Sequence, residues 1–160
     1  SSSQHHRWRH MIRPGLGVVL AGVRETGDCG PLLDAIPYMR LLGLSASVRD
    51  GDLLTRMPGS EHLVGNPMLP ALHGGTIGAL MESSAILKVL LESDTQEVPK
   101  TITLTVDYLR SAHVVDTWAR ASITRLGRRV ANVQVRAWQD QEDRPIAVAH
   151  AHFLLRSQRD

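Results

Sequence analysis

The sequence predicts an α+β fold in which an antiparallel β-sheet curls around one long, buried α-helix. Ten of the fifteen residues from Ile77 to Leu91 are apolar and cover nearly every side of a helical wheel. A helix that is apolar all round is enclosed by protein or membrane, and this one is too short and too interrupted by polar residues to span a bilayer. The last third of the chain has the pattern of successive strands with short links, which form antiparallel sheets.

The 160 residues make one domain, which we assign to residues 31–160. Residues 1–30 are expected to be a leader or a poorly ordered N-terminal segment. The single cysteine, Cys29, excludes an intrachain disulfide and is consistent with a reducing, cytoplasmic compartment. A net charge of +2 without a basic motif does not indicate nucleic-acid binding, and no apolar run reaches the ~18 residues of a membrane span.

The domain is expected to begin with a short amphipathic helix. From Pro31 to Leu42 apolar residues recur at helical spacing, although Pro37 lies inside this range. Gly43 follows at the position of a helix C-cap.

A β-hairpin and a loop are expected before the buried helix. Leu44 to Arg49 and Leu53 to Met57 alternate in polarity around Asp50-Gly51-Asp52, which is typical of a hairpin turn. The segment 65–71 holds two prolines and is expected to be a loop. The buried helix should then extend to about Ser93.

Four strands should complete the fold: Thr101 to Leu109, Trp118 to Leu126, Val130 to Trp138 and Ile146 to Leu155. In the first of them, apolar Ile102, Leu104, Val106 and Tyr108 alternate with polar residues, which is typical of a β-strand. Tight turns at Gly127-Arg128 and at 140–144 link the later strands.

Glu82 is a carboxylate within the apolar helix. Its neighbours at three and four residues are Gly78, Ala79, Ala85 and Ile86. None of them can pair with a charge, and Lys88 faces another side of the helix. Such a carboxylate is either solvated by a cleft or raised in pKa, and both conditions suit catalysis.

These features resemble the hotdog-fold acyl-CoA thioesterases, in particular the phenylacetate-degradation (PaaI-like) group. The resemblance covers roughly Leu32 to Leu155. It rests on Asn66 ahead of His73-Gly74-Gly75, the acid nine residues after the histidine, Tyr108-Leu109-Arg110-Ser111-Ala112 after a strand, and a Gly-Arg turn before the closing strands. It implies a hotdog fold that hydrolyses acyl-CoA thioesters to the carboxylic acid and CoA, with no metal or other cofactor.

The resemblance also implies a role for each site residue. Glu82 is the nucleophile or general base, the backbone N–H of Gly74 polarises the thioester carbonyl, His73 and Asn66 position the thioester, and Thr101 holds water. Asn66 departs from the family pattern because it lies seven residues before the histidine instead of six. Ile86 stands where some members carry a hydroxyl.

The chemistry of thioester hydrolysis fits a helix N-terminus. The reaction develops negative charge on the carbonyl oxygen, and the first N–H groups of a helix are unpaired and lie at its positive end. Gly74 and Gly75 lie there and allow close approach of the substrate to the backbone.

Helix geometry predicts a composite site. Gly74 and Glu82 are eight residues apart, which is ~12 Å along a helix, so one carbonyl cannot contact both groups of one chain. We therefore expect a homodimer, alone or as a dimer of dimers, in which Gly74 of one subunit faces Glu82 of its partner.

Arginines near strand ends are candidates for the phosphates of CoA: Arg110, Arg125, Arg128 and Arg129. His150 and His152 share one strand face, but without an evident third ligand no metal is predicted. Two other functions stay open: a hotdog dehydratase or hydratase acting on acyl thioesters, and a non-catalytic acyl-CoA-binding protein.

Overall fold

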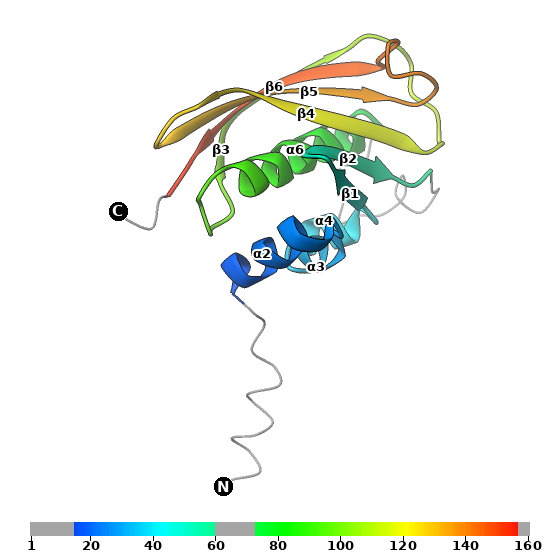
Figure 1. The fold of residues 1–160 in the computed structure, drawn as a ribbon. Helices are drawn as coiled ribbons and strands as arrows, with labels where there is room; N and C mark the ends of the chain where they lie inside the picture. Colours follow the sequence, from blue (N-terminus) through cyan, green and yellow to red (C-terminus); the bar gives the residue numbers. More distant parts are fainter. Residues whose placement is uncertain (1–14, 60–72, 157–160) are drawn as a thin grey trace, which may run out of the picture.

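The computed structural model describes residues 15–59 and 73–156, and its sheet has the strand order β1-β2-β4-β5-β6-β3. The elements are α2 (Leu16–Thr26), α3 (Gly30–Asp34), α4 (Pro37–Leu41), β1 (Ser45–Arg49), β2 (Asp52–Met57), α6 (His73–Glu92), β3 (Lys100–Tyr108), β4 (Thr117–Leu126), β5 (Val130–Trp138) and β6 (Ala147–Leu154). All neighbouring strands are antiparallel, and the sheet curls over α6 (Figure 1). The predicted α+β fold is confirmed.

Helix α6 is covered from two sides. The sheet lies above it, and α2, α3 and α4 lie below it (Figure 1). Side chains that point to different sides of the helix, such as Leu80, Met81 and Leu90, are fully buried. Enclosure on both sides explains why the helix is apolar around nearly its whole circumference.

The N-terminal boundary predicted from the sequence is wrong for residues 16–30. Helix α2 buries Leu20 and Val23 in the common core, and the loop after it leads into α3. The Arg24 guanidinium donates to three carbonyl oxygens at the end of α6, those of Leu90, Leu91 and Ser93. This arginine satisfies orphan carbonyl groups of the helix terminus and ties α2 to α6. Residues 1–14 lie outside the described residues.

The helix predicted over Pro31 to Leu42 is two helices. Proline lacks an N–H and clashes with the preceding turn, so Pro37 begins α4 instead of continuing α3. Ile36, just before it, is extended with φ −118° and ψ 99°. Gly43 ends α4 as predicted, with φ +70° and its N–H 2.9 Å from the carbonyl oxygen of Arg40.

The predicted hairpin is confirmed as β1 and β2. Arg49 pairs with Asp52, which leaves Asp50 and Gly51 as a two-residue turn. Their φ values are +52° and +78°, as a turn that matches the twist of the strands requires. The predicted loop at 65–71 lies outside the described residues.

A β-bulge changes the predicted pattern of β3. Thr101 pairs with Phe153 and Thr103 pairs with His152, so Ile102 is the extra residue. Thr101 therefore lies on the helix-facing side with the buried Phe153. Ile102 is 52% exposed, so the alternation in polarity does not place this apolar side chain in the core.

Candidate functional site

Glu82 lies in the middle of α6 and is half-buried. It forms no hydrogen bond or ion pair with any other residue in the described ranges 15–59 and 73–156. Lys88 instead contacts the carbonyl oxygen of Gly51 and the carboxylate of Glu92. A half-buried carboxylate without a cation is free to act on a substrate.

One face of α6 is less covered than the rest. Gly75, Glu82 and Ile86 are half-buried, whereas the other residues from Thr76 to Leu90, Lys88 excepted, are buried. These three positions follow the spacing of a single helical stripe. The stripe places Glu82 on the incompletely covered face of an otherwise enclosed helix.

Two tyrosines lie near Glu82 or its face of α6: Tyr38, which no sequence pattern indicated, and Tyr108, which the sequence indicated only as the start of a motif. Burial, together with the negative charge of Glu82, raises the pKa of the Tyr38 phenol on α4. Burial raises the pKa of Tyr108, whose hydroxyl lies 3.4 Å from the position that a Cβ on Gly78 would take. Gly78 is one turn before Glu82, so the Tyr108 hydroxyl lies at the face of α6 that carries Glu82. The Tyr38 phenol lies close enough to Glu82 for its charge to raise the phenol's pKa.

The first turn of α6 contains Gly74 and Gly75, as predicted. Its N–H groups have no acceptor within the helix. Gly74 and Glu82 lie on one unbroken helix, so the separation of ~12 Å holds. Asn66 and the side chain of His73 lie outside the described residues, and their roles stay predictions.

Thr101 and the thiol of Cys29 differ in how far their surroundings allow a role in the reaction. Thr101 is half-buried on the helix-facing side of β3, and its role in holding water stays a prediction. Burial, with the charge of Asp28, raises the pKa of Cys29 to about 11. This thiol is fully buried and protonated, which excludes it as a nucleophile near neutral pH.

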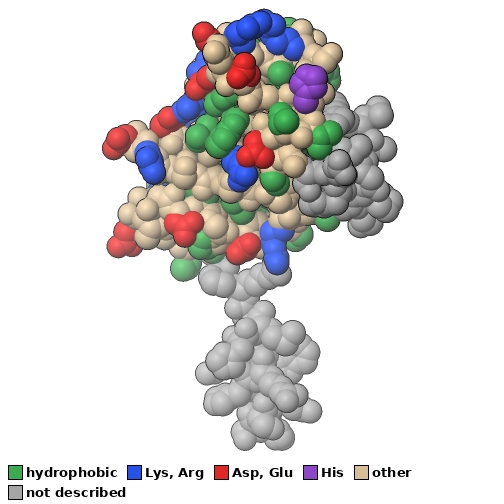
Figure 2. All heavy atoms as spheres, turned by 90° about the vertical axis from the view of Figure 1, so that its right-hand side faces the viewer, with side chains coloured by type: hydrophobic (Ala, Val, Ile, Leu, Met, Phe, Trp, Pro, Cys, Tyr) green, Lys and Arg blue, Asp and Glu red, His purple; other side chains and the backbone are tan. Residues whose placement is uncertain are grey.

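A basic cavity, here called the Arg110 pocket, lies where β3 and β5 end and β6 begins. It has a volume of about 330 Å³ and is lined by Arg110, Ser111, His113, Val115, Gln139, Asp140, Arg144 and Ile146. Tyr108 reaches α6 at Gly78, so the pocket is at the N-terminal end of α6. Figure 2 looks onto this end of the molecule, where hydrophobic side chains lie among basic and acidic ones.

Arg144 and His113 were missed because they follow no motif. Each lies in an irregular segment, and only the converging ends of β3, β5 and β6 bring them to Arg110. The cationic side chains outnumber the single carboxylate of Asp140, so the pocket suits an anionic ligand.

The other candidate arginines are far from this pocket within one chain. Arg128 and Arg129 lie in the turn between β4 and β5, at the opposite end of the sheet. The carbonyl oxygen of Arg129 accepts from the N–H of Leu155, 2.7 Å away. Arg125 lies on β4 near the same turn. Strands of eight to ten residues separate the two ends by roughly 25–30 Å.

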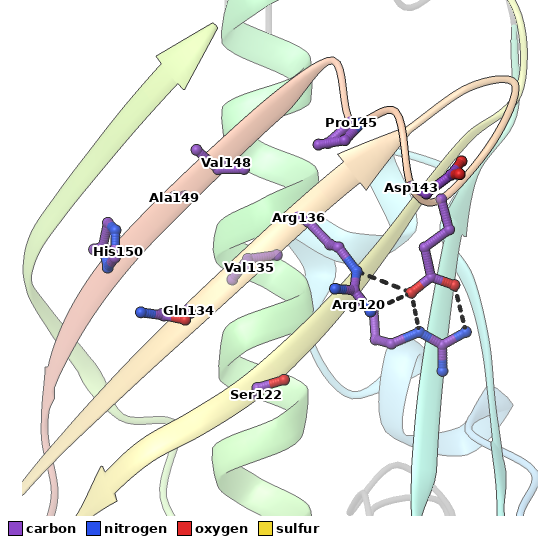
Figure 3. A pocket seen from close by; sticks show the side chains of 11 residues that line it. Arg120, Ser122, Gln134, Val135, Arg136, Asp143, Pro145, Val148, Ala149 and His150 are labelled. Atoms are coloured by element: carbon purple, nitrogen blue, oxygen red, sulfur yellow. Dashed lines mark hydrogen bonds and ion pairs between the residues drawn. The ribbon is translucent and has the colours of Figure 1, made fainter. Parts of the chain in front are cut away.

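A second cavity lies on the face of the sheet turned away from α6 (Figure 3). It has a volume of about 440 Å³, and Ser122, Gln134 and His150 lie side by side across its floor. Glu142, Asp143 and Pro145 form its wall. The sheet separates this cavity from Glu82, so we do not assign it to the candidate site.

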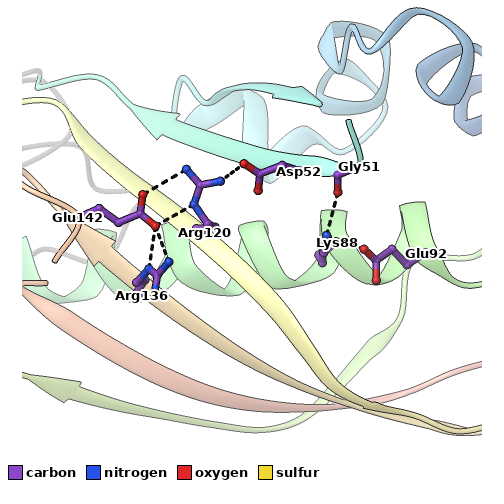
Figure 4. Close-up of polar contacts among 7 residues, drawn as sticks. All are labelled: Gly51, Asp52, Lys88, Glu92, Arg120, Arg136 and Glu142. Atoms are coloured by element: carbon purple, nitrogen blue, oxygen red, sulfur yellow. Dashed lines mark hydrogen bonds and ion pairs between the residues drawn. The ribbon is translucent and has the colours of Figure 1, made fainter. Parts of the chain in front are cut away.

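The wall of this second cavity is fixed by ion pairs. Glu142 accepts hydrogen bonds from the guanidinium groups of Arg120 and Arg136 (Figure 4). Arg120 also pairs with Asp52 beside the hairpin turn. The network joins the hairpin, β4, β5 and the loop before β6.

Replacing Glu142 with glutamine is expected to lower the free energy of unfolding at pH 7 by roughly 1 kcal/mol. Burial alone would raise the pKa of Glu142, but the hydrogen bonds and charges of Arg120 and Arg136 outweigh it and lower the pKa. The folded carboxyl thus has the lower pKa, so its contribution is present above the unfolded pKa and is lost as pH falls through the folded one.

Urea unfolding of wild type and Glu142→Gln at pH 7 and pH 4 checks this prediction. The difference between the two proteins should shrink at pH 4. Asp143→Asn is the matched control, because its exposed carboxylate forms no ion pair with the described residues. An equal difference at both pH values would contradict the prediction.

No helix within residues 15–59 and 73–156 has the length and hydropathy needed to cross a membrane. In the same residues, no three His, Cys, Asp or Glu side chains are grouped so that they could hold a metal ion.

Residues 69–146 match the family model described as the thioesterase superfamily. A solved structure from Chromobacterium violaceum is 37% identical; the match covers 87% of this chain and 97% of that one, with a TM-score of 0.68. The chain belongs to the thioesterase superfamily. No curated protein matched the sequence.

More distant solved structures share the hotdog fold of this thioesterase-superfamily protein. One is a variant of the phenylacetic acid degradation protein PaaI from Thermus thermophilus, 20% identical over 75% of this chain and 99% of that one, with a TM-score of 0.59. Another is a Bacillus halodurans protein solved with CoA, 22% identical over 90% and 91% of the chains, with a TM-score of 0.61. Identities this low show the fold alone, and they confirm the predicted hotdog fold.

Proposed function

We propose that this protein hydrolyses acyl-CoA thioesters to the carboxylic acid and CoA. The observation that carries the proposal is Glu82: a half-buried carboxylate without an ionic partner among the described residues, on the less covered face of α6. Membership of the thioesterase superfamily gives the reaction class. The N–H groups of Gly74 and Gly75, which have no acceptor within the helix, supply the complementary oxyanion donors.

In the proposed reaction the N–H of Gly74 donates to the thioester carbonyl oxygen, where negative charge develops. The Glu82 carboxylate either attacks the carbonyl carbon or takes a proton from the attacking water. If Glu82 attacks, the C–S bond breaks to give an anhydride between Glu82 and the acyl group, and water then hydrolyses this anhydride to the carboxylic acid and restores Glu82. If Glu82 acts as a base, the activated water adds to the carbonyl carbon and the C–S bond breaks as the acid forms. In both routes CoA leaves as the thiolate and takes up a proton. His73 and Asn66 position the thioester, and Thr101 holds the water.

A composite site at a homodimer interface is part of the proposal. The ~12 Å between Gly74 and Glu82 on one helix requires one of the two to come from the partner subunit. Two further observations support an interface on this side. The stripe of α6 that carries Glu82 is incompletely covered, and β3, an edge strand, exposes 52% of both Ile102 and Tyr108. Open apolar edges are normally paired or covered.

Antiparallel pairing of two β3 edges would also explain the distribution of arginines. A two-fold axis turns the partner's sheet end for end. The partner's turn between β4 and β5, with Arg128 and Arg129, would then lie toward the end that carries Arg110. Arginines from both ends could contact one CoA molecule. The Bacillus halodurans neighbour was solved with CoA, which is consistent with a CoA-binding role for this fold.

Replacing Arg110 with alanine is expected to raise KM for an acyl-CoA roughly tenfold with little change in kcat. Arg110 would bind the phosphates of the leaving group and not the reacting carbonyl, so its loss weakens binding uniformly. Arg128→Ala should behave alike if the partner's turn reaches the ligand. Steady-state kinetics with acyl-CoA and with the matching N-acetylcysteamine thioester, which lacks phosphates, measure the effect.

Arg49→Ala serves as the control for loss of an exposed arginine, because Arg49 lies at the hairpin turn. Arg49→Ala should leave KM and kcat unchanged with both substrates. An Arg110→Ala variant with unchanged KM for acyl-CoA would contradict the assignment of the Arg110 pocket to CoA.

The experiment that tests the function is free-thiol release from short-chain, long-chain and aryl acyl-CoAs by the wild-type protein. Release from at least one substrate supports the proposal and begins to define the acyl group. Tight acyl-CoA binding without release would indicate a binding protein. Addition of water to an enoyl-CoA without thiol release would indicate a hydratase.

A further inference from the structure

The connection between β3 and β4 forms one wall of the Arg110 pocket. Residues 109–116 belong to neither strand, yet they include Arg110, His113 and Val115, all of which line the pocket. An irregular segment keeps a binding geometry only if other groups fix it. Two side chains, Gln139 and Asp116, do so here.

Gln139 holds the middle of the connection. Its Oε1 accepts from the N–H of His113 at 3.1 Å, and its Nε2 donates to the carbonyl oxygen of His113 at 2.9 Å. The same nitrogen contacts Oγ1 of Thr117, 3.0 Å away. The amide thus fixes both backbone groups of one pocket residue.

Asp116 holds the end of the connection. Its Oδ1 accepts from the N–H of Gly59 at 2.9 Å, and its Oδ2 accepts from Nε of Arg56 at 2.9 Å. The Arg56 guanidinium also lies 5.8 Å from the ring centroid of Trp118, which fixes its position. Asp116 itself does not line the pocket.

Gly59 packs directly against this wall. A Cβ on Gly59 would lie 2.4 Å from Cα of Val115 and 2.5 Å from its carbonyl carbon. No side chain fits there without displacing backbone. The chain leaving β2 is therefore pressed against the pocket's wall, and Asp116 fastens the two together.

We propose that Asp116 is a positioning residue for the Arg110 pocket: by joining Gly59 and Arg56 to the connection between β3 and β4, it sets the pocket that receives the phosphate-bearing part of CoA. This inference rests on the proposed function. Asp116 touches neither the ligand nor the reacting atoms. It acts through the backbone that carries Arg110, His113 and Val115.

The test compares two thioesters of the same acyl group, one of CoA and one of N-acetylcysteamine. Asp116→Ala should raise KM for the acyl-CoA about five- to tenfold, since small misplacements of binding groups are costly, and leave kcat within about twofold. Its kinetics with the N-acetylcysteamine thioester should stay within about twofold of wild type. Asp116→Asn keeps an acceptor for the N–H of Gly59, so its KM for the acyl-CoA should rise less than that of Asp116→Ala.

Asp52→Ala is the matched control, because it removes another exposed aspartate paired with an arginine, at the hairpin instead of at the pocket. Asp52→Ala should leave KM and kcat unchanged with both thioesters. Gly59→Ala gives a second, independent variant, which should displace Val115 and reproduce the effect of Asp116→Ala. Thermal unfolding confirms that each variant is folded.

Calorimetric titration with CoA itself separates this inference from the proposed function. If wild type binds CoA but hydrolyses nothing, the proposed function fails while a five- to tenfold weaker Kd in Asp116→Ala still supports the positioning role. The positioning role would be overturned if Asp116→Ala lost equal activity on both thioesters. It would also be overturned if the KM of this variant for acyl-CoA and its Kd for CoA stayed within about twofold of wild type. Wild-type protein that does not bind CoA would overturn it as well.

Discussion

Glu82→Gln is expected to lower kcat for acyl-CoA hydrolysis by roughly 10³-fold while CoA binding stays within about twofold of wild type. Glutamine keeps the size and a carbonyl acceptor but can neither attack the thioester nor accept the proton of water. The surroundings of the carboxylate make substitution tolerable, since no cation among the described residues depends on it. Free-thiol release measures the loss, and calorimetry measures CoA binding.

Glu92→Gln is the matched control. Glu92 lies on the same helix, is exposed, and pairs with Lys88. Its replacement should leave kcat unchanged. An active Glu82→Gln protein would make Glu82 a structural carboxylate and would move the catalytic role to another residue.

Gly74→Pro is expected to lower kcat by about 10²–10³-fold, the usual cost of one oxyanion donor. Proline removes the backbone N–H, and the first turn of a helix tolerates it because that N–H has no acceptor within the helix. Gly74→Ala keeps the N–H and is the control for the added side chain, so its kcat should fall less than that of Gly74→Pro. Equal losses in both variants would show that space at Gly74 matters and not its N–H.

The enclosed helix and the sheet could be predicted because each carries a strong local pattern. Helix α6 is apolar around its circumference because it is buried on both sides. Strands β4 and β5 alternate in polarity because only one face of each is buried. The isolation of Glu82 on α6 also follows from helical spacing alone. These features depend on neighbours within a few residues.

The features that the sequence patterns did not predict depend on contacts between residues far apart in the chain. Arg24 of α2 donates to carbonyl groups at the C-terminal end of α6 and so holds α2 in place. No local sequence pattern reveals this contact. The bulge at Ile102 is set by the register against β6. The Arg110 pocket draws Arg144 from a loop that follows β5. Tertiary packing decides each of these, and local propensity does not.

The measurement that tests the central claim most directly is complementation between Glu82→Gln and Gly74→Pro, mixed under conditions that exchange subunits. In a composite site each heterodimer holds one intact site, with Gly74 from one chain and Glu82 from the other. Random exchange of equal amounts should then recover about a quarter of the wild-type thiol release from two nearly inactive proteins. Heterodimers identified by native mass spectrometry that show no activity above the parents would contradict a site shared between subunits.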